Sequence, residues 1–134
     1  MEEPPNHSVR VSVPPRAEFL ALLRTITGSV ATRMQLPLDT IDDLRLAVDE
    51  AVAFLLTTNR NAARVEMRLV PGDAELMTTI LADSHVERWP PRGYQETLSW
   101  QVISGLTDAA SISRTERGAA TITFRKRTPD ARPT

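Results

Sequence analysis

Glu50 is the residue of this chain whose type and spacing are best suited to chemistry. It lies in the apolar-rich run 44–56, and Phe54 follows it one helical turn later. A carboxylate on a helix face can act as a general base, and a magnesium-dependent site would place an oxygen ligand at the second position. The benzyl ring of Phe54 offers no such ligand. The run therefore predicts one wall of a nucleotide pocket that has lost part of its chemistry.

Asp83 and Gly93 are the other candidates for such a pocket. Asp83 ends an apolar stretch, and Gly93 precedes a helical segment. Phosphate cradles need closely spaced glycines, because the backbone must approach the anion and adopt positive φ. The chain has only five glycines, and no two of them form a Gly-x-Gly element. We therefore expect no more than the remnant of a nucleotide site.

These residues also have ordinary structural interpretations. Glu50 can be a solvated acid on a polar stripe shared with Asp43, Ala47 and Phe54, opposite the core stripe of the same helix. Asp83 can be a turn-starting aspartate that bonds its own backbone. The two histidines have no partner at ligand or triad spacing, and no metal site is expected.

Arg24 is a candidate for binding rather than for chemistry. In the helical segment 17–34 it lies off the core stripe, on a side face shared with Leu20, Thr27 and Ala31. An arginine among small and apolar neighbours can pack through its stem and pair bidentately with a partner's carboxylate. The alternative is a surface arginine without a partner. We expect these four residues to form a partner-binding surface.

The composition indicates a single cytoplasmic domain. The chain has 134 residues and no cysteine, which suits a reducing compartment. Its net charge of −1 lacks the basic excess of a nucleic-acid binder, and no run reaches the ~20 apolar residues that cross a bilayer. The N-terminus lacks the features of a signal peptide. We expect neither a nucleic-acid nor a membrane partner, and we interpret the basic cluster 125–127 as a solvated terminus.

The hydrophobic periodicity predicts the element order βααββαββ. Strands are expected at 9–13, 65–69, 76–80, 111–113 and 119–126, and helices at 17–34, 40–57 and 98–108. The side chain of Asp39 is expected to cap the second helix. Hairpins separated by helices predict an α/β two-layer sandwich with three helices on one face of a mixed β-sheet. The domain is expected to span residues 9–127, between flexible tails at 1–8 and 128–134.

A family resemblance is carried by the segments that contain the candidate residues. The helix with Leu22-Leu23-Arg24, followed by the run 43–51 around Glu50, resembles the anti-sigma factor serine kinases of bacterial partner-switching systems. Those kinases belong to the histidine-kinase-like (GHKL, Bergerat-fold) ATPases. The likeness extends over residues 9–126, and the segment 98–102 is similar to the divergent actinobacterial branch. The resemblance implies a Bergerat-type, HATPase-like fold.

The resemblance also assigns roles to the candidates for chemistry. Glu50 matches the glutamate that activates the serine hydroxyl of the protein substrate, and Phe54 replaces the asparagine that holds magnesium. Asp83 matches the strand-end aspartate that receives adenine, with His85 and Glu87 in place of two glycines. The resemblance therefore implies a degraded ATP and magnesium site, and neither is favoured as a cofactor.

The remaining matches imply a binding protein. Gly93 is all that is left of the phosphate-loop glycines, and Arg24 matches an arginine that contacts the sigma factor and its antagonist. The resemblance implies a homodimeric regulator of transcription in stress responses. It would sequester an alternative sigma factor and be released by a competing STAS-type anti-anti-sigma protein.

Two alternatives stay open. An active ATP-dependent serine/threonine-protein kinase would phosphorylate its antagonist, with Glu50 as the base and an unusual magnesium shell. A structural or sensory domain with partners outside transcription would share the same fold, because fold does not fix function.

Overall fold

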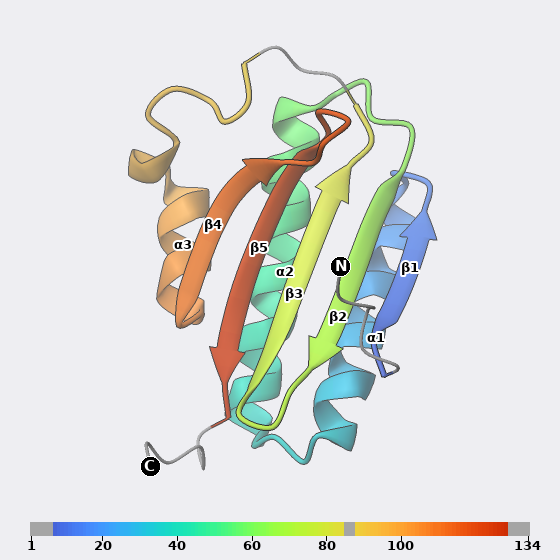
Figure 1. The fold of residues 1–134 in the computed structure, drawn as a ribbon, viewed down its shortest axis with the longest axis vertical. Coiled ribbons are helices and arrows are strands. Elements are labelled where there is room, and N and C mark those ends of the chain that lie inside the picture. The colour runs from blue at the N-terminus through green and yellow to red at the C-terminus, as the bar shows by residue number, and fades with distance from the viewer. Residues whose placement is uncertain (1–6, 85–87, 129–134) are drawn as a thin grey trace.

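The chain folds into two layers, a five-stranded sheet and three α-helices that cover one of its faces (Figure 1). The computed structural model describes residues 7–84 and 88–128. The elements are β1 (Val9–Val13), α1 (Ala17–Arg33), α2 (Leu38–Thr58), β2 (Val65–Pro71), β3 (Glu75–Ala82), the 3-10 helix η1 (Tyr94–Glu96), α3 (Leu98–Leu106), β4 (Ala109–Arg114) and β5 (Ala120–Arg127). The predicted two-layer α/β class and the order βααββαββ are confirmed, with η1 added before α3.

The sheet is antiparallel throughout. Its strand order is β1-β2-β3-β5-β4, and each of the four neighbouring pairs runs antiparallel. The expectation of a mixed sheet was therefore wrong. The chain does cross from β3 through α3 to β4, which runs in the same direction as β3, but β5 inserts between these two strands and pairs with both.

The core lies between the sheet and the helices. Successive strand residues point to opposite faces, so Met67, Ile80 and Ile122 are fully buried under the helices while their neighbours in β2 and β3 remain half exposed. The central helix α2 buries Leu44 and Leu55 against the sheet. The other face of the sheet carries no helix (Figure 1) and is called the open face below.

The start of α2 differs from the prediction. The helix begins at Leu38, and its N-cap is Pro37, which has no side-chain capping bond. Asp39 lies in the first turn, where its negative charge faces the positive end of the helix dipole. The expected side-chain cap by Asp39 was therefore wrong, because the helix starts before this residue.

The expected tails fall mostly outside the described residues. At the two borders, His7 Nε2 donates to the carbonyl of Pro71 at 2.6 Å, and the N–H of Thr128 donates to the carbonyl of Ala74 at 2.9 Å. Among the helices that the structure describes, none has the length and apolar character needed to span a bilayer.

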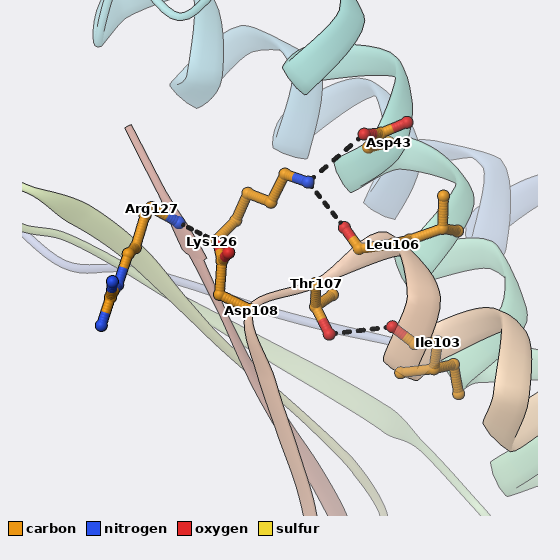
Figure 2. Close-up of polar contacts among 7 residues, drawn as sticks. All are labelled: Asp43, Ile103, Leu106, Thr107, Asp108, Lys126 and Arg127. Atoms are coloured by element: carbon orange, nitrogen blue, oxygen red, sulfur yellow. Dashed lines mark hydrogen bonds and ion pairs between the residues drawn. The ribbon is translucent and has the colours of Figure 1, made fainter. Parts of the chain in front are cut away.

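Lys126 joins three elements at the C-terminal end of α3 (Figure 2). Its Nζ donates to Asp43 Oδ2 in α2 at 3.3 Å and to the carbonyl of Leu106 at 2.9 Å. The side chain is only 17% exposed. Next to it, Asp108 Oδ2 accepts the N–H of Arg127 at 2.6 Å. The interpretation of residues 125–127 as a solvated cluster was therefore wrong for Lys126, which fixes the last turn of α3 to α2 and β5.

Candidate functional site

The stripe of α2 that carries the candidate chemistry faces α3 rather than solvent. Ala47 is fully buried, Phe54 is 8% exposed, and Asp43 and Glu50 are half-buried. The sequence placed this stripe opposite the core, which was wrong because α3 packs along this side of α2. The position of a residue on a helix is set by periodicity, but the helix that covers it is set by tertiary structure.

Glu50 is held by a serine of α3. Ser99 Oγ donates to Glu50 Oε1 at 2.8 Å. Ser99 lies in the first turn of α3, next to the N-cap Thr97, whose Oγ1 accepts the N–H of Trp100 at 3.2 Å. The cap fixes the direction of the first turn and so places the hydroxyl of Ser99 at the carboxylate. Glu50 therefore links α2 to α3 through a hydrogen bond and is not a freely solvated acid.

Phe54 packs on a tryptophan from the segment before α3. The ring centroids of Phe54 and Trp89 lie 5.8 Å apart, with the planes tilted by 50°. Trp89 is 5% exposed, and its Nε1 donates to the carbonyl of Ser113 at 2.8 Å. Arg114 Nε in turn donates to the carbonyl of Trp89 at 3.2 Å. The place one turn after Glu50 is thus filled by two aromatic rings.

Asp83 and Gly93 are the other two residues predicted for a nucleotide site. Asp83 is exposed and lines a hollow of about 840 Å³ on the open face of the sheet, together with Arg68 and Leu81. Gly93 is exposed with a φ of 74°, and it starts the 3-10 helix η1. In the part of the chain that the structure describes, the hollow lined by Asp83 includes neither Glu50 nor Gly93. The other two positions assigned to that site, His85 and Glu87, lie outside the described residues.

The opposite side of α2 borders a hollow. Arg24 NH1 in α1 donates to Asp49 Oδ2 in α2 at 3.0 Å, and the two side chains are 43% and 39% exposed. They lie beside a hollow of about 300 Å³ between the two helices, which has a mainly apolar lining of Ala17, Leu20, Ala21, Val52, Ala53 and Leu56. A second hollow of about 320 Å³ continues from Arg24 and Asp49 to Leu46, which is 55% exposed.

The partner-binding surface predicted from α1 is only partly at the surface. Leu20 and Arg24 line the hollow, but Thr27 and Ala31 are fully buried, so their expected place on the surface was wrong. The residues of α2 that complete the hollow were missed. Asp49, Ala53 and Leu56 follow at helical spacing and could have been found as a stripe next to Glu50.

Comparison with known proteins shows which proteins this chain resembles. No family model matches the chain. The chain is 34% identical over 103 residues to the anti-sigma-F factor RsbW of Mycobacterium tuberculosis, found in two strains, and the match covers 75% of this chain. Over most of its own length the chain is therefore similar to an anti-sigma factor. It spans 58% of the length of these curated relatives.

Solved structures share the fold of this chain. The RsbU and RsbW domains of a Mycobacterium tuberculosis protein superpose with a TM-score of 0.66 at 17% identity, covering 97% of this chain and 34% of that chain. The SiaB–SiaC complex from Pseudomonas aeruginosa gives a TM-score of 0.63 at 12% identity and covers 89% of each chain. The Bergerat-type architecture expected from the sequence is confirmed.

The side chains of this protein do not fit a magnesium-bound nucleotide beside Glu50. Magnesium requires near-octahedral oxygen ligands, and the buried ring of Phe54 supplies none. The carboxylate of Glu50 is already hydrogen-bonded by Ser99. In residues 7–84 and 88–128, no three histidine or acidic side chains form a group that could hold a metal ion. The described side chains therefore provide no magnesium site for phosphoryl transfer beside Glu50.

Proposed function

We propose that this protein is a cytoplasmic anti-sigma factor that sequesters an alternative sigma factor by occupying it, without phosphoryl transfer. A competing STAS-type antagonist would release the sigma factor by binding the same surface. Such a switch needs only a difference in affinity between two partners. The observation that carries the proposal is the hollow between α1 and α2, where the Arg24–Asp49 pair adjoins apolar side chains.

The chemistry of this hollow suits a helix or loop of a protein partner. Its apolar side chains, which include Leu20, Val52 and Leu56, offer area for burial. Arg24 has five N–H donors in a planar fork, and the bond from NH1 to Asp49 leaves donors for a carboxylate of the partner. A sigma-factor segment with apolar residues and one acid would satisfy both parts of the surface.

We also propose that the protein forms a homodimer through the open face of its sheet. The 840 Å³ hollow on this face carries both signs of charge, from Arg10, Arg64 and Arg68 and from Glu66, Asp83 and Glu116. Among the ion pairs of the described residues, none joins two of these side chains. A two-fold axis would place the basic part of one copy against the acidic part of the other. Arg68→Glu should then give a monomer in sedimentation, with Arg60→Glu as an exposed control.

The test of the proposed function is the retention of purified sigma factors from the source organism. Immobilised wild-type protein should retain one alternative sigma factor, and Arg24→Glu should weaken that binding by about a hundredfold, since it reverses a charge at the centre of the surface. Arg33→Glu is the matched control, because Arg33 is also an exposed arginine of α1 but does not line either of the two hollows beside Arg24.

Two results would contradict the proposal. If wild-type protein retains none of the sigma factors, the assignment of the partner is wrong. If Arg24→Glu retains the sigma factor as well as Arg33→Glu does, the proposed binding surface is wrong, although the assignment of the partner is still supported. Addition of a STAS-type antagonist to the complex should release the sigma factor in the absence of ATP.

A further inference from the structure

We propose that Trp89 is an internal plug of the space between α2 and β4, and that it excludes a nucleotide there independently of Phe54. The inference rests on the proposed loss of nucleotide binding and names a second cause for it. The loss of an oxygen ligand at position 54 is visible in the sequence. The plug is visible only in the structure.

The position of Trp89 is fixed from three directions. Its ring lies against Phe54 of α2, its Nε1–H is bonded to the carbonyl of Ser113 in β4, and its own carbonyl accepts Arg114 Nε. With 5% of its surface exposed, it is buried although it belongs to no helix or strand. A residue of an irregular segment normally lies at the surface, so this burial depends on the specific contacts of the side chain.

Aromatic residues gather at this end of the helical layer. The chain has only six aromatic side chains, and four of them form two ring pairs here, Phe54 with Trp89 and Tyr94 with Trp100. Tyr94 and Trp100 pack edge to face at 5.2 Å and hold the segment that leads from Trp89 into α3. The chain segment that follows Trp89 is therefore itself anchored at the start of α3.

The plug and the hydrogen bond from Ser99 lie on the same side of α2. Ser99 satisfies the carboxylate of Glu50, and one turn along α2 the indole of Trp89 covers the ring of Phe54. An indole is a fused bicyclic ring of about the size of a purine, so its volume alone excludes a nucleotide group from this space. Replacing Phe54 with an oxygen ligand would leave that volume filled. The structure therefore predicts that nucleotide binding needs two changes rather than one.

The test compares four proteins by titration calorimetry with Mg-ATP: wild type, Phe54→Asn, Trp89→Gly and the double variant. We expect no binding by the wild type or by Phe54→Asn, and binding by the double variant that is at least about tenfold tighter than any binding by Trp89→Gly. Free indole should raise the melting temperature of Trp89→Gly, because it refills the space of the deleted side chain. That shift also shows that the variant is folded.

The outcomes separate the two claims. Binding of Mg-ATP by Phe54→Asn alone would overturn the plug, because Trp89 would still be in place. A folded double variant that does not bind would overturn it as well. Binding by the wild type would instead contradict the proposed loss of nucleotide binding, and retention of a sigma factor would remain a separate question.

A second measurement tests the plug in a chain that keeps Trp89. In Trp100→Phe, Trp89 is the only tryptophan, so all tryptophan fluorescence comes from the plug. We expect emission at short wavelength, weak quenching by acrylamide and no change on addition of Mg-ATP. Quenching as strong as that of free tryptophan would show that the indole is solvated, and the proposal would fail.

Discussion

The two sides of α2 are built in opposite ways. Toward α3, the surface of the helix is covered by the Phe54–Trp89 ring pair and by the hydrogen bond from Ser99 to Glu50. Toward α1, the same helix borders a hollow of about 300 Å³ with a mainly apolar lining. The comparison teaches that the side with the residues predicted for catalysis contributes to stability, while the hollow lies on the other side.

Two adjacent acidic residues show that the packing around a side chain determines its role. Asp49 and Glu50 are neighbours in the chain, about 100° apart around the helix axis. Asp49 pairs with Arg24 of α1 in a half-exposed position beside the hollow, and Glu50 accepts a bond from Ser99 on the side of α2 that faces α3. Substitutions on the side of α2 that faces α3 should therefore lower the free energy of unfolding. Substitutions beside the hollow between α1 and α2 should instead weaken the binding of the partner.

Phe54→Ala should have the largest effect on folding. It removes a buried ring that packs on Trp89, so we expect a loss of about 3–5 kcal/mol in the free energy of unfolding, measured by urea denaturation. Leu20→Ala on the half-buried side of the hollow is the comparison and should cost about 1 kcal/mol, well below full burial of the side chain. Equal losses for the two variants would show that the sides of α2 do not differ in packing.

Lys126→Met should come next. The change removes a cation that is mostly buried and leaves Asp43 and the carbonyl of Leu106 without this donor, so we expect a loss of about 1–3 kcal/mol. Arg127→Met is the control, since the exposed Arg127 is bonded to Asp108 through its backbone N–H only. If both variants unfold at the same urea concentration, the contacts of Lys126 do not stabilise the end of α3.

Ser99→Ala should cost about 1 kcal/mol, the usual worth of one hydrogen bond to a half-buried group. Ser104→Ala, at an exposed position of the same helix, should change stability by less than about 0.5 kcal/mol. Thermal unfolding of the two variants under identical conditions measures the difference. A Ser99→Ala protein as stable as the wild type would mean that Glu50 does not tie α2 to α3.

Arg24→Ala should have the smallest effect on folding. The Arg24–Asp49 pair is about 40% exposed, and exposed pairs contribute between 0 and about 1 kcal/mol. The same variant should lose most of its affinity for the sigma factor, which a binding titration beside the unfolding curve would show. A loss of stability as large as that of Phe54→Ala would identify Arg24 as a structural residue and end its role as a partner contact.

The fold was largely predictable because local patterns and global structure agree. The alternation in β2 and β3 and the helical spacing in α1 and α2 gave the correct order of elements, and the run 43–51 indicated the family. The pairing within the sheet was not predictable in the same way. Insertion of β5 between β3 and β4 depends on contacts that are distant in sequence, and periodicity does not report them.

The site was predicted less well, for reasons that particular residues illustrate. Glu50 was identified, but its bond to Ser99 depends on how α3 packs. Thr27 was expected at the surface because helical spacing places it on the same side face as Arg24. It is buried because its Oγ1 donates to the carbonyl of Leu23 in its own helix at 2.7 Å, which satisfies the hydroxyl without water. The burial of Trp89 had no signal in the sequence beyond the scarcity of aromatic residues.

The bond from Trp89 to Ser113 also concerns the solubility of the molecule. β4 is the last strand of the sheet, and Arg114 is its only charged residue, so its unpaired edge has little protection against the addition of a foreign strand. The bond of Trp89 to Ser113 and the bond of Arg114 to the carbonyl of Trp89 hold the segment around Trp89 beside the end of this strand. Variants without Trp89 should therefore aggregate through strand addition at high concentration, even where the monomer keeps its fold.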